Sequence, residues 1–255
     1  MSDLEVVRDG AVVRVLLNRP ARHNALTKAM YAELADLVSG LRDDDSVAVL
    51  VLRGAGGRAF AAGNEIADFA ADDADPVAHE AGIRALLRGL AELSQVTVAA
   101  VEGVCVGGGL AIATHCDLRL ATEGSRFGYP IARTLGNVLP AAVLYRCVAV
   151  FGESLTREML LASRLVGADR AHAVGAVMDV VPAENLSAAV DDLVGGVLRA
   201  SGVTLRATKA QLLARADGVE RPPADDDLRL AEVYGGPDFA EGVRAFLAKE
   251  KPRFA

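Results

Sequence analysis

Apolar and polar positions alternate with two different periods along the first part of the chain. The stretch "LEVVRDGAVVRVLLNRP" holds two β-rich runs joined at Asp9-Gly10, a pair that strongly favours a hairpin. In "LTKAMYAELADLVSGLRDD" apolar residues recur at helical spacing, and Thr27 is placed to cap the helix. "VAVLVLRG" is a continuous apolar run of the kind that is buried on both faces of a sheet. The pattern therefore predicts a hairpin, a helix and a buried strand, in this order.

The same alternation continues to about residue 186 and then stops. Residues 76–93 are helical by pattern, "TVAAVEG" is the next strand, and three glycines precede a short helix and the strand "DLRLAT". A recurring order of strand, strand and helix predicts an α/β fold in which helices cover the faces of a sheet. Beyond "VVPAENL" the β signal vanishes, and the helical pattern is broken only at "VERPPADDD" and "YGGPDF". We therefore predict a core over residues 1–186 and a helical region over residues 187–255.

Composition and charge restrict the class of protein. Hydrophobic residues make up 52% of the 255 residues and charged residues 24%, which excludes a disordered chain and suits a globular enzyme. The apolar runs are far shorter than the roughly 18 residues that span a bilayer, so we expect no membrane partner. The net charge is −7 with no basic block, so we expect no nucleic-acid partner. The N-terminus "MSDLEVVRDG" is acidic and lacks the regions of a signal peptide, which predicts a cytoplasmic protein.

Cysteine and histidine give no sign of a cross-linked or metal-bound protein. The cysteines are odd in number and lie in apolar contexts, so we interpret them as small buried residues and not as a disulfide framework. They are Cys105, Cys116 and Cys147. The four histidines lack the spacing that is typical of metal ligands, and we expect no metal site.

Two glycine-rich segments follow predicted strands and indicate a site built from backbone groups. Gly63 and Asn64 end the segment "RGAGGRAFAAGN", and residues 107–109 are the three glycines of "GVCVGGGLAIATHCD". Neither segment has the Gly-x-Gly-x-x-Gly order of a dinucleotide site or the Lys-Ser/Thr of a P-loop. One such glycine-rich segment by itself is explained by a tight turn or by close backbone packing. Two together favour a pair of N–H groups that converge on one oxygen, the minimum for stabilising an enolate or a tetrahedral oxyanion.

Six motifs occur in one order along almost the whole chain: "NRPARHNAL", "RAFAAGNEI", "VAAVEGVCVGGGLAIATHCDLRLAT", "RFGYP", "ADRAHAVGAVMDVVP" and "EGVRAFLAKEKPRF". In these motifs the chain resembles the enoyl-CoA hydratase/isomerase, or crotonase, superfamily. The resemblance implies a spiral of ββα units, with a helical C-terminal region that assembles into trimers or pairs of trimers. It also implies an acyl-CoA thioester as substrate, with no cofactor besides the coenzyme A that is part of the substrate.

The resemblance also assigns positions in the site. The family's oxyanion hole corresponds to the backbone N–H groups of Asn64 and Gly108, and Gly108 begins a helix whose dipole adds positive potential. Basic candidates for contacts with the phosphates of coenzyme A are Arg22, His23, Lys28, Lys249, Lys251 and Arg253. The positions expected to line the substrate pocket are Arg22, Ala25, Ala62, Asn64, Glu65, Ile66, Gly108 and Ile131.

The chain departs from the family pattern at two positions that matter for the reaction. Family hydratases use two glutamates to activate and place a water molecule, and the matching positions here are Ala111 and Ile131. Neither side chain can transfer a proton, so we expect poor hydration of an enoyl thioester. Hydration or isomerisation by other groups, decarboxylation and thioester hydrolysis all remain open. A catalytically inactive acyl-CoA-binding subunit is the alternative from another class of function.

Several residues elsewhere are candidates for the missing proton transfer, each with a plainer interpretation. His79 lies on the helix that covers the acyl pocket in the family, and it is either an acid–base group or a surface histidine. Arg133 is one of the residues that bracket the segment of the second glutamate, and it either binds a polar group of the substrate or pairs with a carboxylate. We interpret Glu65 as a structural residue that pairs nearby, and Asp68 as a solvated carboxylate.

Overall fold

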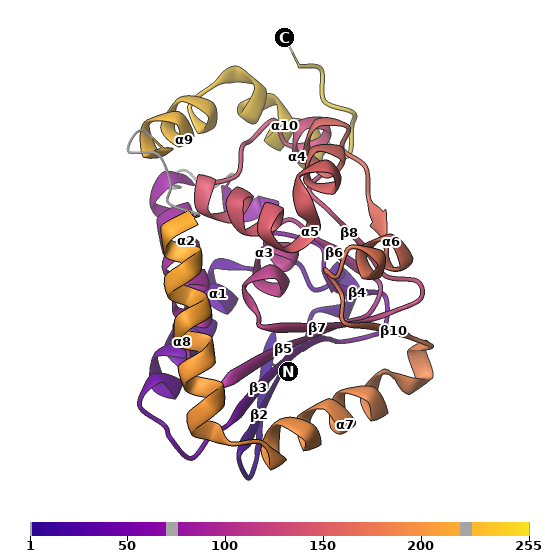
Figure 1. The fold of residues 1–255 in the computed structure, drawn as a ribbon. Helices are drawn as coiled ribbons and strands as arrows, with labels where there is room; N and C mark the ends of the chain where they lie inside the picture. Colours follow the sequence, from indigo (N-terminus) through magenta and orange to yellow (C-terminus); the bar gives the residue numbers. More distant parts are fainter. Residues whose placement is uncertain (1, 70–75, 220–225, 255) are drawn as a thin grey trace.

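The computed structural model describes residues 2–69, 76–219 and 226–254 (Figure 1). Within these ranges, a six-stranded sheet has the order β1-β2-β3-β5-β7-β10 and a four-stranded sheet has the order β4-β6-β8-β9. The strands of the larger sheet are β1 (Leu4–Asp9), β2 (Val12–Leu17), β3 (Val49–Gly54), β5 (Val96–Val101), β7 (Leu118–Thr122) and β10 (Asp179–Val181). Those of the smaller sheet are β4 (Ala59–Ala61), β6 (Val104–Val106), β8 (Arg126–Gly128) and β9 (Val166–Gly167).

Helices cover the sheets and make up the C-terminal region. The α-helices are α1 (Lys28–Arg42), α2 (Pro76–Glu92), α3 (Gly108–His115), α4 (Ile131–Thr134), α5 (Ala141–Leu161), α6 (Ala168–Ala173), α7 (Leu186–Arg199), α8 (Gly202–Val219), α9 (Asp226–Tyr234) and α10 (Pro237–Ala248). Short 3-10 helices are η1 (Pro20–Arg22), η2 (Ile66–Phe69) and η3 (Ala183–Asn185). The helical C-terminal region is confirmed for the described residues, whereas most of the break predicted at "VERPPADDD" lies outside them.

The first elements form where the local sequence predicts them. β1 and β2 are antiparallel with Asp9 opposite Val12, and Gly10 in the turn has a φ of 56°, which glycine adopts without strain. Thr27 caps α1, because its hydroxyl accepts a hydrogen bond from the backbone N–H of Met30 at 3.1 Å. The predicted hairpin and the predicted helix cap are both confirmed.

Consecutive strands divide between the two sheets. β3, β5 and β7 are parallel neighbours in the larger sheet, and the strands that follow them, β4, β6 and β8, are parallel neighbours in the smaller one. A helix follows each pair, α2 after the first and α3 after the second. This repeated turn of two strands and a helix is the spiral of ββα units that the sequence predicts, and the fold prediction is confirmed.

The larger sheet has helices on both of its faces. Leu50 and Leu52 of β3 belong to a core cluster with residues of α1, α2 and α3, whereas Val49 and Val51 pack with Val190 of α7. β3 is therefore buried on both faces, as its continuous apolar sequence predicts. Figure 1 shows α7 crossing one face of the sheet, opposite the side of α1 and α3. The division of the chain at residue 186 stays a prediction, since α7 packs directly against the sheet.

The last two helices close the end of the molecule at which α4 lies (Figure 1). Leu230, Tyr234 and Phe239 of α9 and α10 form a small buried cluster, against which Val138 and Val243 pack. The rings of Tyr234 and Phe239 meet edge to face, with centroids 4.7 Å apart. These contacts bring the C-terminal helices next to the loop between α4 and α5.

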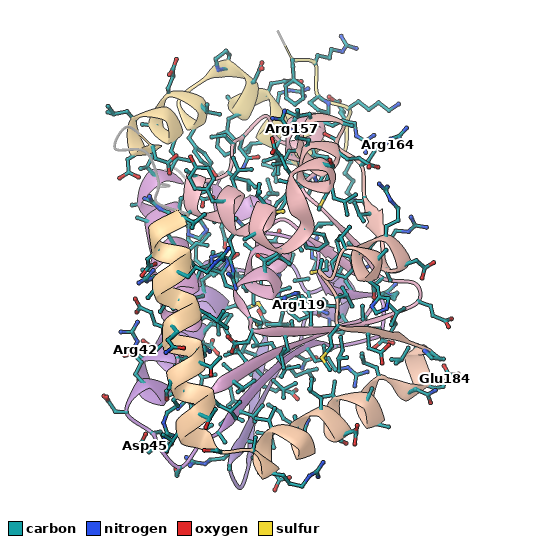
Figure 2. The ribbon with its side chains drawn as sticks, in the orientation of Figure 1. Arg42, Asp45, Arg119, Arg157, Arg164 and Glu184 are labelled. Atoms are coloured by element: carbon teal, nitrogen blue, oxygen red, sulfur yellow. The ribbon has the colours of Figure 1, made fainter. Side chains whose placement is uncertain are left out.

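A half-buried arginine, Arg119, binds the carbonyls at the C-terminal end of α3. Figure 2 labels Arg119 near the middle of the view. The Arg119 guanidinium donates to the carbonyl oxygens of Ala113 and Cys116, at 3.1 and 2.8 Å. Burial lowers the pKa of Arg119. The last carbonyls of a helix lack partners within it and carry partial negative charge, so this cation satisfies them where the dipole favours it.

The cysteines are buried free thiols, as predicted. Burial raises the pKa of Cys147 to about 11, so this thiol is protonated at neutral pH. In the described ranges, no helix combines the length and the apolar character that crossing a membrane requires.

Candidate active site

The two glycine-rich segments of the sequence meet at one end of the smaller sheet. β4 ends at Ala61 and β6 ends at Val106, and the two strands are parallel neighbours. The segments that follow them therefore begin side by side. Gly63 has a φ of +98° and Gly107 a φ of +53°, and L side chains rarely adopt such backbone conformations. Both turns thus require glycine.

The two segments approach each other too closely for side chains. A Cβ atom on Gly107 would lie 3.2 Å from the Cα atom of Gly63. A Cβ atom on Gly108 would overlap the hydroxyl of Tyr31 and the side-chain oxygen of Asn64, which are themselves hydrogen bonded at 2.7 Å. Gly108 and Asn64 are therefore immediate neighbours in space although they are distant in sequence.

The backbone N–H groups of Asn64 and Gly108 are free donors. On either side of Asn64 the backbone is engaged: Gly63 accepts from the N–H of Leu26 at 2.8 Å, and the N–H of Glu65 donates to Leu26 at 2.7 Å. Gly108 is the first residue of α3, where N–H groups have no acceptor within the helix. Within the described parts of the chain, neither N–H group forms a hydrogen bond. Two neighbouring free donors suit one negatively charged oxygen.

Both residues line a cavity of about 460 Å³. The cavity wall includes every position that the sequence predicts for the substrate pocket, namely Arg22, Ala25, Ala62, Asn64, Glu65, Ile66, Gly108 and Ile131. Most of the remaining wall is apolar, with Ile83 of α2, Val143 of α5 and Phe239 and Phe246 of α10 among its residues. A largely apolar cavity with two convergent donors is a typical site for a small molecule that has one polar end.

Comparison with known proteins identifies the family. The sequence matches the family described as enoyl-CoA hydratase/isomerase over residues 8–255. The chain belongs to this family. It is 31% identical over 255 residues to the 2,3-dehydroadipyl-CoA hydratase of Escherichia coli, with 100% of this chain and 99% of that protein covered. It is 30% identical over 244 residues to the crotonyl-CoA hydratase of Syntrophomonas wolfei, with 93% and 92% covered.

A solved structure agrees with this assignment. The enoyl-CoA hydratase/isomerase from Pseudoalteromonas atlantica superposes with a TM-score of 0.87 at 27% identity, and 100% of both chains is covered. The similarity thus extends over the spiral core and the C-terminal helices together. Asn64 and Gly108, where the resemblance implies the oxyanion hole, both belong to the cavity wall.

The two positions where family hydratases carry glutamate are apolar parts of the cavity wall. Ala111 lies on α3, one turn after Gly108, and Ile131 begins α4. Both line the cavity and are buried. Neither side chain can transfer a proton.

His79 and Arg133 are not in the cavity wall as the described residues define it. His79 of α2 is half-buried and meets the ring of Tyr31 edge to face, with centroids 5.8 Å apart. Burial and the nearby Lys28 lower the pKa of His79, so the ring is neutral at pH 7. Arg133 of α4 is exposed, and among the described residues no carboxylate pairs with it. Neither candidate therefore belongs to the described residues that line the cavity, although His79 contacts Tyr31, whose hydroxyl is hydrogen bonded to Asn64.

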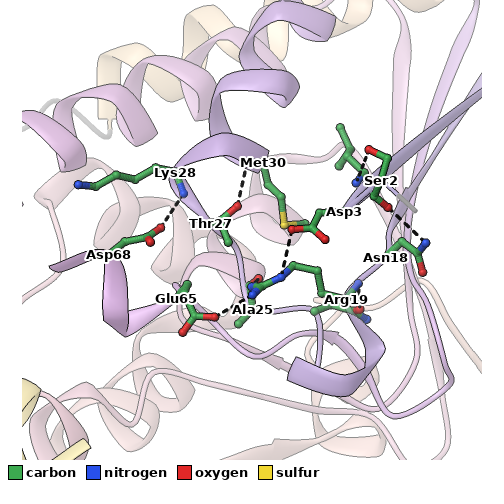
Figure 3. Close-up of polar contacts among 12 residues, drawn as sticks. Ser2, Asp3, Asn18, Arg19, Ala25, Thr27, Lys28, Met30, Glu65 and Asp68 are labelled. Carbon is green, nitrogen blue, oxygen red and sulfur yellow. Dashed lines mark hydrogen bonds and ion pairs between the residues drawn. The ribbon is translucent and has the colours of Figure 1, made fainter. Parts of the chain in front are cut away.

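Glu65 and Asp68 brace the loops around the cavity (Figure 3). The Glu65 carboxylate forms an ion pair with the guanidinium of Arg19 at 3.0 Å. The same guanidinium donates a hydrogen bond to the carbonyl of Ala25 at 2.6 Å. This is the pairing role that the sequence indicates for Glu65. The Asp68 carboxylate, predicted to be solvated, also accepts an exposed hydrogen bond from the backbone N–H of Lys28 at 2.8 Å. It satisfies one of the free donors at the start of α1.

Sequence reasoning missed Glu80, a buried carboxylate in the cavity wall. Glu80 lies on α2, is 6% exposed and accepts a hydrogen bond from the hydroxyl of Tyr234 at 2.6 Å. Burial raises its pKa. A signal was present, because Glu80 occupies the apolar face of the helix with Ile83 and Leu87. Its partner, however, is 154 residues away in sequence.

We expect Gly108→Val to abolish turnover of acyl-CoA thioesters, because the new side chain fills the space in front of the two donors. Binding of coenzyme A should weaken much less, since the nucleotide is held elsewhere. Turnover measured by mass spectrometry and binding measured by calorimetry test this. Gly40→Val, on the exposed face of α1, is the matched control with open space around its Cβ. Unchanged turnover in folded Gly108→Val protein would contradict the assignment of the oxyanion donors.

Proposed function

We propose that the protein is an acyl-CoA enzyme that holds the thioester oxygen of its substrate between the N–H groups of Asn64 and Gly108. The absence of acceptors for these two groups in the described structure, at the wall of an apolar cavity, supports this proposal most directly. Polarising the carbonyl makes the α-proton more acidic and stabilises the enolate that its removal leaves. Losing one such donor typically costs about 10²- to 10³-fold in rate.

Helix α3 adds to the positive potential at this oxygen. Its N-terminus begins at Gly108, so the positive end of the helix dipole points to the donors. At the opposite end, Arg119 and Arg146 donate to the last carbonyls, with Arg146 bonded to Thr114 at 2.9 Å. An oxyanion gains more from these fixed dipoles in a dry cavity than it would in water.

The proposed substrate has an apolar acyl group and the phosphates of coenzyme A. Arg22 is exposed and lines the cavity, where it can contact a phosphate. The C-terminal Lys249, Lys251 and Arg253 are exposed and are further candidates. The proposed reaction needs no cofactor besides the coenzyme A of the substrate. A cytoplasmic location stays a prediction from the sequence.

We further propose that the reaction proceeds through the enolate without efficient addition of water. The apolar Ala111 and Ile131 support this, since they stand where family hydratases carry their two glutamates. The relatives of this chain include isomerases as well as hydratases. One of them is the 1,2-epoxyphenylacetyl-CoA isomerase of Escherichia coli, which is 29% identical over 249 residues. The same two positions also favour a second candidate, an acyl-CoA-binding subunit without activity.

We expect crotonyl-CoA to be hydrated several orders of magnitude more slowly than by a two-glutamate hydratase. Each missing group is worth roughly 10²- to 10⁴-fold. The assay is loss of the enoyl-thioester absorbance. Ala111→Glu combined with Ile131→Glu is the matched variant, in which hydration should rise provided that the fold survives two buried carboxylates. Wild-type turnover close to that of an efficient hydratase would contradict this account of the reaction. Wild-type protein that binds acyl-CoA but neither exchanges its α-proton nor changes it would instead favour the inactive subunit.

We propose that the enzyme assembles as a trimer or as a pair of trimers. None of the described residues of α8 is buried, and the helix exposes Val203, Leu212 and Val219. Leu161, at the end of α5, is 78% exposed and lies in the same surface hollow as Val219. Apolar patches of this kind mark interaction surfaces, and a second copy of the chain would cover them.

Light scattering at micromolar concentration should therefore give a mass of three or six chains. One chain has a mass of 26.5 kDa. The burial of the apolar side chains on α5 and α8 supplies the free energy of association. A stable species of 26.5 kDa under these conditions would contradict the proposed assembly.

A further inference from the structure

Glu80 of α2 lines the same cavity as the glycine turns. It is the carboxylate of the cavity wall that forms no ion pair at short range with the described cations, unlike Glu65, which Arg19 neutralises. A carboxylate that is only 6% exposed is expensive to bury without compensation. Such a group at a ligand cavity is a candidate for proton transfer.

Two neighbours hold the Glu80 carboxylate in place. The hydroxyl of Tyr234, on α9, donates to it at 2.6 Å, and the side-chain amide of Asn137 donates to that hydroxyl at 3.3 Å. Asn137 also lines the cavity, and its buried side-chain oxygen has no partner within the described parts of the chain. This chain of hydrogen bonds holds one oxygen of the Glu80 carboxylate, and no hydrogen bond from the described residues engages the other.

Glu80 and the two oxyanion donors line the same cavity. Tyr31 connects the two, because its hydroxyl donates to the side chain of Asn64 and adjoins Gly108. Burial, and after it the negative charge of Glu80, raises the pKa of Tyr31. The carboxylate thus acts electrostatically on a group that touches both donor residues. A substrate whose carbonyl oxygen is held by the donors extends into the cavity that Glu80 lines.

The charged and titratable groups around Glu80 come from three helices. On α2 itself, Arg84 lies one turn away, and it pairs with Asp227 of α9 at 2.7 Å. Tyr31 faces it from α1 and Tyr234 from α9. Burial raises the pKa of Glu80, whereas the Tyr234 hydrogen bond and Arg84 oppose this rise. The carboxylate is therefore a stronger base than an ordinary glutamate.

We propose that Glu80 is the catalytic acid–base group of this enzyme and that Tyr234 positions it, in place of the two glutamates that the chain lacks. The proposal rests on the proposed function, in which Asn64 and Gly108 hold the thioester oxygen. One carboxylate cannot both activate water and protonate carbon at the same time. It can move a proton between two carbons of the same acyl chain, which makes the reaction a shift of a double bond.

The steps balance for a 3-enoyl thioester. The Glu80 carboxylate takes a proton from C2, the C2–H electron pair forms the C1–C2 double bond, and the carbonyl pair moves to the oxygen held by the donors. The oxygen pair then re-forms the carbonyl, the C1–C2 pair moves to form a C2–C3 double bond, and the C3–C4 pair takes the proton back from Glu80 at C4. The product is the 2-enoyl thioester, and no other reactant is consumed.

The test uses 3-butenoyl-CoA with the full-length protein. Its conversion to crotonyl-CoA is followed by the rise in enoyl-thioester absorbance, and exchange of the α-protons of butyryl-CoA in D2O is followed by mass spectrometry. Wild-type protein should catalyse both. Glu80→Gln should lower both rates by roughly 10²- to 10⁴-fold while butyryl-CoA binding is retained. Glu123→Gln, an exposed glutamate in the turn before β8, is the control and should match the wild type.

A pH profile distinguishes catalysis from a merely structural clamp between α2 and α9. The base must be ionised, so the rate should rise with pH through the raised pKa of Glu80. Tyr234→Phe removes a hydrogen bond that stabilises the carboxylate, so the rise of the rate should move to higher pH. In Glu80→Gln the rise of the rate with pH should vanish. Should Glu80→Gln fail to fold, the Tyr234→Phe profile decides the matter.

The results separate the two proposals. A Glu80→Gln protein that keeps the wild-type rate and pH dependence overturns the role of Glu80. So does a Tyr234→Phe protein in which the rise of the rate with pH stays at the wild-type pH. Either result leaves the oxyanion site intact. Wild-type protein that binds butyryl-CoA but neither exchanges its protons nor converts 3-butenoyl-CoA overturns the proposed function, and the role of Glu80 with it.

Discussion

The backbone contact between the ends of β4 and β6 is the constraint on which the site depends. A Cβ atom on Gly109 would lie 2.6 Å from the carbonyl oxygen of Ala61, and one on Gly107 would press against Gly63. With side chains at these positions the two segments would separate, and the N–H groups of Asn64 and Gly108 would no longer point to a common place. The spiral of ββα units makes the contact possible, because it brings the ends of two successive short strands side by side.

The same contact fixes the electrostatics of the cavity. Since α3 starts within the glycine segment, its positive end lies at the donors, and the half-buried Arg119 binds carbonyls at its negative end. These hydrogen bonds fix the orientation of the helix dipole toward the place where a negative oxygen develops. The two backbone donors are thus held by the packing of the core. The proposed acid–base group, Glu80, and its partner Tyr234 lie on other elements, α2 and α9.

The local sequence was sufficient to predict the elements that depend only on residues close together in the chain. The Asp9-Gly10 turn, the Thr27 cap and the doubly buried strand β3 each depend on neighbouring residues, and all three were predicted. The pair of glycine-rich strand ends indicated converging N–H donors, although one such segment has a plain structural explanation. The assignment of the donors to Asn64 and Gly108 came from the family resemblance.

Contacts between distant segments could not be predicted in this way. Glu80 owes its character to Tyr234, and Arg119 owes its role to carbonyls that only the folded helix presents. The periodicity of α2 contained a signal, since one acidic residue interrupts its apolar face. Its meaning needed the helix α9, which follows a stretch outside the described residues. In the sequence, His79 was a more conspicuous candidate than Glu80, because the usual pKa of a histidine lies near neutral pH. In the structure, burial and Lys28 lower the pKa of His79, and its ring lies against that of Tyr31.

The central claim is that two backbone N–H groups polarise the thioester carbonyl, and the vibration of that carbonyl tests it most directly. Butyryl-CoA with a 13C-labelled thioester carbonyl would be bound to the protein and examined by infrared difference spectroscopy. Two donors at the positive end of α3 should move the carbonyl stretch to lower frequency than in water, because they weaken the C=O bond more than solvent does. A bound thioester whose carbonyl stretch is equal to or higher than its value in water would contradict the account.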